Sequence, residues 1–271
     1  MDISQFKGRH VFVAGGSTGI NFGIAQAFAR AGANLAVLSR SQEKVDTAAA
    51  QLRSLGGQAL GLAADVRQPE ALQRAFAAAH ERFGPIDVLV SGAAGNFLAR
   101  ALDMSPNAFK TVVDIDLLGS FNVARLAHAH LRKPGACVIQ ISAGQSFTPT
   151  AFQAHVCAAK AGVDMLTRVL ALEWGPEGIR INSIVPGPIA DTEGLKRLAP
   201  GEDNLKAMAE RVPLQRLGRI EDIARMAMML ASDWGSYITG TVIPVDGGLA
   251  LTGPRDFTVA AEATRRQHAQ Q

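Results

Sequence analysis

The sequence feature that most restricts the fold of this 271-residue chain is the regular alternation of short β-rich runs with amphipathic helical stretches. Runs rich in Val, Ile, Leu and Ala predict strands at residues 11–13, 34–38, 59–63, 86–90, 138–141, 179–185 and 241–245. Helical periodicity predicts helices at residues 20–31, 41–55, 69–83, 106–131, 152–174 and 220–230. Strands joined through helices run parallel, and their crossovers are right-handed. The pattern therefore predicts an α/β fold whose doubly wound parallel sheet of about seven strands is flanked by helices.

Three further features concern the organisation of the chain. No Pro/Gly/Ser-rich linker interrupts it, so we expect one domain over residues 1–271. The segment at residues 190–212 follows Pro186, Gly187 and Pro188 and is rich in charged and small residues. It predicts a mobile helical lid over the carboxyl edge of the sheet. The weakly patterned tail at residues 254–271 is expected to be loose.

Charge and cysteine usage narrow the class of protein. The chain has 27 basic and 24 acidic residues, and a net charge of +3 is too small to predict nucleic-acid binding. No apolar run reaches the length of a membrane span. Neither end carries a recognisable targeting signal, so we expect a cytoplasmic location. Cys137 and Cys157 have no metal-ligand spacing, which predicts two reduced thiols and no metal.

A glycine-rich turn, AGGSTGIN at residues 14–21, joins the first predicted strand to the first predicted helix. Glycines in such a turn let backbone N–H groups approach a pyrophosphate at the helix N-terminus. Turns of this kind also occur merely to connect two elements. The position between a strand and a helix of a βαβ unit nevertheless favours a Rossmann-like dinucleotide site.

The end of the second predicted strand discriminates between two cofactors. An NAD site carries an acid there for the ribose 2′-hydroxyl. This chain has Ser39, Arg40 and Ser41 instead, with no acid before Glu43. Arg40 can pair with a 2′-phosphate, and the two hydroxyls can add hydrogen bonds. An ordinary exposed arginine is the alternative, but the chemistry favours NADP(H).

Six motifs resemble those of the short-chain dehydrogenase/reductase family over nearly the whole chain. They are the glycine turn, Asp65-Val66, Ala93-Ala94-Gly95, Lys160, Pro186-Gly187 and Asp246-Gly247-Gly248. The resemblance and the cofactor argument together predict these cofactor-binding residues: Gly15, Ser17, Thr18, Gly19, Ile20, Ser39, Arg40, Asp65, Val66, Ala93, Gly95, Lys160, Pro186, Gly187, Ile189 and Thr192. Asn21 replaces the third glycine of the family's turn. Asn tolerates a positive φ, so the turn is expected to form, but with the side chain crowding the phosphates.

The catalytic centre departs from the family pattern. Most members use a Ser, a Tyr and a Lys, but Val156 stands four residues before Lys160, and Ala143 occupies the Ser position. The single tyrosine, Tyr237, lies elsewhere in the sequence. Reduction of a ketone leaves a localised alkoxide that needs a strong proton donor. Reduction of a conjugated thioester leaves a delocalised enolate that water can protonate at carbon. The missing phenol therefore favours the second reaction.

Asp116 stands where the family has Asn, and it predicts a buried ion pair with Lys160. The alternative is an acid on a helix surface. Residues 92–98, 107–116 and 186–195 resemble the 2,4-dienoyl-CoA reductases, in particular the peroxisomal type, which also lacks the Tyr and pairs an Asp with the Lys. The resemblance implies NADPH-dependent reduction of 2,4-dienoyl-CoA to 3-enoyl-CoA, an auxiliary step of fatty-acid β-oxidation, in a bacterial-type relative. Lys160 would anchor the cofactor and stabilise charge, and Asp116 would position a water.

Several other residues are candidates for contact with an acyl-CoA substrate, each with an ordinary structural alternative: Asn96, Phe97, Gln145, Phe147, Phe152 and His155, with Lys196 and Arg197 for the CoA phosphates. Two other functions stay open. One is an NADP-dependent carbonyl (3-oxoacyl) reductase in which His155 or water replaces the Tyr. The other is a catalytically silent NADP-binding oligomeric protein. The apolar faces of the two long predicted helices favour a homo-oligomer, commonly a tetramer in this family.

Overall fold

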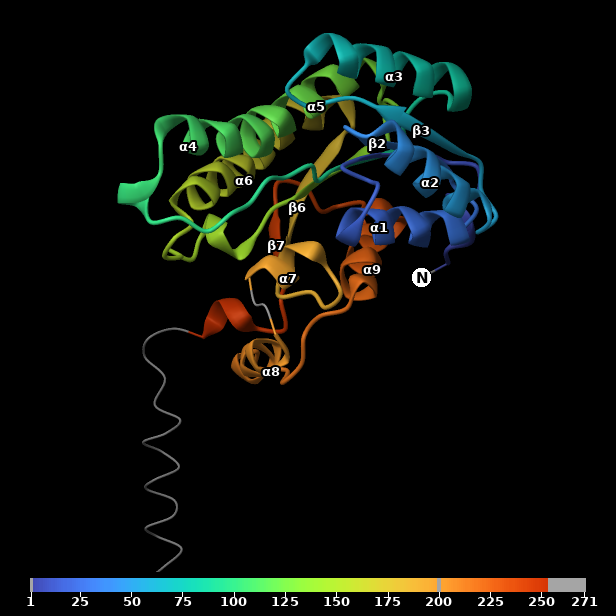
Figure 1. The fold of residues 1–271 in the computed structure, drawn as a ribbon. Helices are drawn as coiled ribbons and strands as arrows, with labels where there is room; N and C mark the ends of the chain where they lie inside the picture. The colour runs from blue at the N-terminus through green and yellow to red at the C-terminus, as the bar shows by residue number, and fades with distance from the viewer. Residues whose placement is uncertain (1, 199–200, 253–271) are drawn as a thin grey trace, which may run out of the picture.

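The computed structural model describes residues 2–198 and 201–252. One parallel sheet of seven strands, in the order β3-β2-β1-β4-β5-β6-β7, forms its centre (Figure 1). The strands are β1 (His10–Ala14), β2 (Asn34–Ser39), β3 (Ala59–Ala63), β4 (Val88–Ser91), β5 (Cys137–Ile141), β6 (Arg180–Pro186) and β7 (Val242–Val245). The predicted fold class is confirmed. The strand order reverses between β1 and β4, and open α/β sheets bind ligands at the carboxyl ends of strands beside such a point.

Helices cover both faces of the sheet, which explains why β1, β2 and β5 read as nearly continuous apolar runs. The helices are α1 (Gly19–Arg30), α2 (Gln42–Arg53), α3 (Pro69–Phe83), α4 (Pro106–Val113), α5 (Gly119–Ala127), α6 (Ala154–Trp174), α7 (Glu193–Leu198), α8 (Glu202–Arg211) and α9 (Ile220–Ala231). One apolar core lies between the sheet and α1, α2 and α9. The other lies between the sheet and α3, α5 and α6, on the opposite side of the sheet in Figure 1.

Most predicted element ends agree with the structure to within two residues, but one predicted helix is interrupted and another begins two residues later than predicted. The single helix expected at 106–131 is wrong: α4 ends at Val113, a π-helical turn spans Asp114–Leu118, and α5 follows. The helix expected from residue 152 begins at Ala154. Phe152 has φ = 64°, a left-handed conformation that a helix cannot contain.

The segment after β6 is helical, as predicted for residues 190–212, because it contains α7 and α8. Its mobility stays a prediction. The tail predicted to be loose, at residues 254–271, lies outside the described residues. Among the described residues, no helix has both the length and the apolar character needed to cross a membrane.

Candidate active site

A buried ion pair lies near the carboxyl ends of β4 and β5. The Nζ of Lys160 lies 3.4 Å from Oδ2 of Asp116, and the two side chains are only 6% and 1% exposed. The predicted pair is therefore confirmed, and the alternative of a surface acid is wrong. Lys160 Nζ also donates to the carbonyl of Ile141 at 3.0 Å, and Asp116 Oδ1 accepts the Gly95 N–H at 2.7 Å. Asp116 Oδ2 accepts no hydrogen bond from the described residues, so one buried acceptor stays available beside an ammonium group.

The π-helical turn explains how Asp116 reaches this position. Such turns are rare and often occur at functional sites. Close helix packing accompanies it: a Cβ on Gly119 would lie 2.6 Å from Val66, and one on Gly162 of α6 would lie 2.8 Å from Leu117. The Ser120 hydroxyl donates to the Asp116 carbonyl at 2.6 Å. The two glycines are the signal in the sequence that could have indicated this interrupted helix.

No tyrosine hydroxyl reaches the ion pair. Val156 is buried on α6, one helical turn before Lys160, at the position where the family has its Tyr. Tyr237 is fully exposed, in the segment between α9 and β7. Ser142, at the end of β5, is buried and its Oγ has no partner among the described residues. The site therefore offers an ammonium and a carboxylate, without a phenol.

The glycine turn has the geometry of a phosphate-binding loop. Gly15 has φ = 77°, and a Cβ there would lie 2.8 Å from the Ala93 backbone nitrogen. Gly19 has φ = 60° and begins α1, and a Cβ there would meet no atom within 4 Å. The side chain of the N-cap residue, Thr18, makes no capping hydrogen bond, so it does not satisfy the first-turn N–H groups of this 12-residue helix. A dinucleotide pyrophosphate fits such a helix end.

Asn21 does not crowd this turn, so the expectation of a side chain facing the phosphates is corrected. It lies within α1 and is 9% exposed. Its Nδ2 donates to the Gly92 carbonyl at 2.8 Å and approaches the Gly15 carbonyl at 3.4 Å. The side chain therefore ties the β1–α1 turn to the loop after β4. Its backbone is also not among the positive-φ non-glycine residues of the described chain, so a left-handed conformation is not what makes Asn acceptable here.

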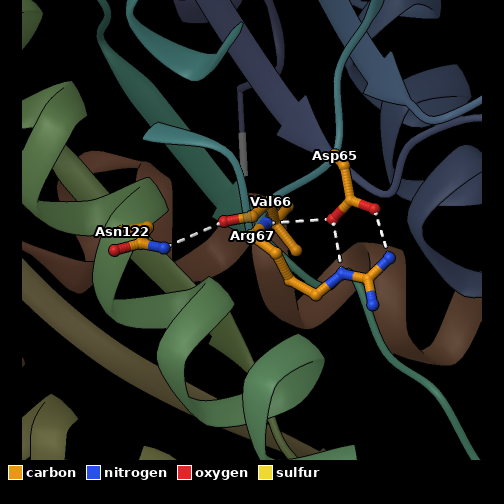
Figure 2. A network of polar contacts seen from close by, with 4 residues as sticks. All are labelled: Asp65, Val66, Arg67 and Asn122. Atoms are coloured by element: carbon orange, nitrogen blue, oxygen red, sulfur yellow. Dashed lines mark hydrogen bonds and ion pairs between the residues drawn. The ribbon is translucent and has the colours of Figure 1, made fainter. Parts of the chain in front are cut away.

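The predicted adenosine end gathers around β2 and β3. Arg40 is exposed, and Ser39 Oγ is buried without a partner among residues 2–198 and 201–252, which leaves both groups available to a ligand. Arg67 binds both carboxylate oxygens of Asp65, at 3.0 and 2.6 Å (Figure 2). The Arg67 guanidinium, and more weakly that of Arg40, lowers the pKa of Asp65 and keeps it ionised.

Two residues that the sequence analysis missed complete this region. The Asn122 amide donates to the Val66 carbonyl at 3.1 Å and fixes the segment after β3 against α5 (Figure 2). Arg67 is the other, and its spacing of two residues from Asp65 is the signal that could have indicated the pairing. Beyond β6, Ile189 and Thr192 are buried, and the Thr192 hydroxyl donates to the Ile189 carbonyl at 2.9 Å.

The candidate substrate residues fall into two groups. The Phe97 ring, in the loop after β4, lies 4.2 Å from the His155 ring between centroids. Asn96 lies exposed in the same loop. Gln145 and Phe147 instead line an open groove of about 430 Å³ beside Ala154, Cys157, Ala158 and Ala161. Helical spacing puts those four residues on a different face of α6 from Val156 and Lys160. Burial lowers the pKa of His155 and therefore favours its neutral imidazole.

Comparisons with known proteins find similarity to reductases and a dehydrogenase. Residues 14–250 match the family model described as enoyl-(acyl carrier protein) reductase. A peroxisomal 2,4-dienoyl-CoA reductase of Arabidopsis thaliana is 45% identical over 92% of this chain and 87% of its own length. Its counterpart from Saccharomyces cerevisiae is 46% identical over 90% and 85%. The crystal structure of a putative short-chain alcohol dehydrogenase from Sinorhizobium meliloti superposes with a TM-score of 0.87, at 33% identity, over 93% of this chain and all of that one. Within the described residues, no cluster of three or more His, Cys, Asp or Glu side chains could hold a metal ion.

Proposed function

The chain belongs to the short-chain dehydrogenase/reductase family of nicotinamide-dependent oxidoreductases, and from this premise we propose that it reduces 2,4-dienoyl-CoA to 3-enoyl-CoA with NADPH. One observation carries the proposal: a buried Lys160–Asp116 pair lies beside Val156, where most of the family has a catalytic tyrosine. The names of the Arabidopsis and yeast relatives support the same substrate class.

The residues at the sheet edge fit a bound NADP(H). The uncapped start of α1 suits the pyrophosphate, and the unpartnered Ser39 hydroxyl with the exposed Arg40 suits a 2′-phosphate. Ala93 and Gly95 lie in the loop after β4, Pro186 ends β6 and Gly187 follows it, and we propose that these residues contact the nicotinamide half. When bound, NADPH supplies the hydride that adds to the δ-carbon of the dienoyl chain.

The reduction leaves a dienolate whose negative charge is shared with the thioester oxygen. The ammonium of Lys160 anchors the cofactor ribose and stabilises that charge in a buried, low-dielectric site. Asp116 Oδ2, which pairs with the ammonium but accepts no hydrogen bond from the described residues, accepts one from a water and orients that water toward the α-carbon. That water gives its proton to the α-carbon while the remaining double bond settles between the β- and γ-carbons. The hydroxide that remains takes a proton from bulk water.

The two other functions are less well supported. A carbonyl reductase that uses His155 as the acid needs a protonated imidazole, and burial disfavours that form. A silent binding protein has no use for a buried ion pair, because apolar residues of similar volume stabilise a core as well or better.

The remaining parts of the proposal concern assembly and location. Exposed apolar side chains on α4, α5 and α6 support a homo-oligomer, which we take to be a tetramer: Phe109, Phe121, Met165, Val169 and Leu172. We propose an acyl-CoA substrate, with no nucleic acid or membrane as partner. A cytoplasmic location remains a prediction from the sequence, whereas the Arabidopsis and yeast relatives are named as peroxisomal enzymes.

The direct test is NADPH oxidation with 2,4-hexadienoyl-CoA compared with acetoacetyl-CoA. We expect turnover with the diene, and turnover with the ketone alone would reject the proposal. Arg40→Asp tests the cofactor assignment. It should lower kcat/KM for NADPH by about tenfold to hundredfold, because a charge-assisted hydrogen bond to the 2′-phosphate is lost, and should leave kcat/KM for NADH no lower.

A further inference from the structure

We propose that His155 and Gln153 form a clasp that holds residues 95–99 as a fixed aromatic wall, against which the flat conjugated part of the acyl chain lies. The acyl substrate in this inference rests on the proposed function. His155 is then a positioning residue rather than the proton donor. The inference therefore adds His155 of α6, and Gln153 just before that helix, to the residues that select the substrate.

Polar contacts fix this segment at three points. The Gly95 N–H donates to Asp116 Oδ1 at 2.7 Å, which ties the start of the segment to the ion pair. Gln153 Nε2 donates to the Phe97 carbonyl at 2.7 Å. The Ala99 N–H donates to the Phe152 carbonyl at 3.1 Å. The segment therefore cannot shift without disturbing either Asp116 or the start of α6.

The His155 imidazole supports the middle of the segment. It is fully buried, and its ring plane is tilted by 41° from that of Phe97 at a centroid distance of 4.2 Å. Neither ring nitrogen makes a hydrogen bond with the described residues. The imidazole packs against the Phe97 ring and also lies close enough to the Phe97 backbone to interact with it, while the Phe97 side chain remains 38% exposed. His155 packs against one side of the Phe97 ring, and the exposed part of that ring is accessible to a ligand.

The backbone at the start of α6 serves the same arrangement. Phe152 adopts φ = 64°, which is strained for a bulky side chain. In this conformation its carbonyl accepts the Ala99 N–H and also lies 3.3 Å from Gln153 Nε2. Strained residues persist where the surrounding structure requires them, and here the requirement is the contact with residues 95–99.

The chemical consequence is selectivity for a planar acyl chain. Aromatic rings pack favourably against flat π-systems. A conjugated dienoyl thioester offers such a face, and a saturated 3-oxoacyl chain does not. Because Gly95 binds Asp116, the same segment also couples the position of the wall to the carboxylate that holds the water.

The test uses Gln153→Ala, His155→Ala, the double variant and His155→Phe, with Glu173→Ala, an exposed residue near the far end of α6, as the control. Each alanine variant should raise KM for 2,4-hexadienoyl-CoA about tenfold, leave KM for NADPH unchanged and keep the shape of the kcat–pH profile. The double variant should lose less than the product of the two single losses, because both residues hold one segment. His155→Phe keeps a ring against Phe97 and should stay within about threefold of wild type.

Two results would overturn the clasp. One is loss of kcat and of a limb of the pH profile in both His155 variants but not in Gln153→Ala, which would make the imidazole a proton donor. The other is unchanged KM in all variants. Hydrogen exchange of the Ala99 amide gives a readout without turnover, and it should accelerate in both alanine variants but not in Glu173→Ala. If wild-type protein fails to reduce the diene, the proposed function fails, and exchange at Ala99 still decides whether the clasp exists.

Discussion

Two buried aspartates lie near opposite ends of β4, and they use their oxygens differently. Asp87, just before the strand, is 7% exposed; its Oδ2 accepts the His10 N–H at 2.8 Å and its Oδ1 accepts from Arg132. Asp116, near the carboxyl end, is 1% exposed, and its Oδ2 accepts no hydrogen bond from the part of the chain that the structure describes. The first carboxylate is used entirely by the fold. The second keeps an acceptor that the fold does not need.

The cations that accompany these two acids differ in the same way. Arg132 is 49% exposed, so solvent screens its charge. Its ion pair with Asp87 therefore resembles a surface salt bridge at the arginine. Lys160 is buried with Asp116, where desolvation opposes both charges. A pair retained under that cost, in which Asp116 Oδ2 faces the ammonium but accepts no hydrogen bond from the described residues, indicates chemistry. A satisfied pair at the other end of the strand indicates stability.

The largest effect should follow from changing the pair at the carboxyl end. Lys160→Ala and Asp116→Ala should each lower kcat for the dienoyl thioester by about 10²–10³-fold, the usual loss when a preorganised charge that stabilises the transition state is removed. Each should also lower stability, because the partner charge is left buried alone. Steady-state kinetics and thermal unfolding measure the two effects separately.

A combined variant separates chemistry from folding. Lys160→Met with Asp116→Leu replaces the pair with apolar side chains of similar volume, so it should recover much of the stability lost in the single variants. It should not recover turnover. Near wild-type rates in the combined variant would remove the roles assigned to both residues.

The next effect concerns the aspartate at the amino end. Asp87→Ala leaves the buried His10 N–H without its acceptor and should lower the free energy of unfolding by about 1–3 kcal/mol. The fully folded enzyme should keep its kcat, because Asp87 lies at the opposite end of β4 from the ion pair. Urea unfolding and kinetics at low temperature check both points. A selective loss of kcat without a loss of stability would contradict the comparison.

The sequence predicted the sheet well because buried parallel strands are recognisable as apolar runs, and it predicted the Lys160–Asp116 pair through resemblance to a family. It did not predict the π-helical turn, which is accompanied by close approaches of Gly119 to Val66 and of Gly162 to Leu117. Local periodicity contains no information on such contacts. Asn21 shows the same limit, since its hydrogen-bond acceptor, Gly92, is 71 residues away.

A smaller effect is expected at Asn21, which joins the glycine turn to the loop after β4. Asn21→Ala leaves the Gly92 carbonyl without its side-chain donor and should cost about 1 kcal/mol of stability, with a rise of a few fold in KM for NADPH. Fluorescence titration with NADPH and thermal unfolding measure these changes. Tighter NADPH binding in Asn21→Ala would restore the rejected idea that this side chain crowds the phosphates.

The smallest expected effect is the dependence of stability on pH, to which buried histidines at both ends of the sheet contribute. His10 and His130 lie near each other at the amino end with His80, and burial lowers the pKa of both His10 and His130 below the ordinary 6.5. Because the folded state disfavours the protonated imidazoles, their contribution to stability is complete above pH 6.5 and is lost as the pH falls below that value. The urea midpoint should therefore decrease below pH 6.5, and His130→Gln should reduce this dependence of the midpoint on pH.

His155 contributes with the same sign at the carboxyl end, so His155→Phe serves as the matched variant there. A midpoint that rises on acidification would show that the amino-end histidines gain, rather than lose, stability when protonated.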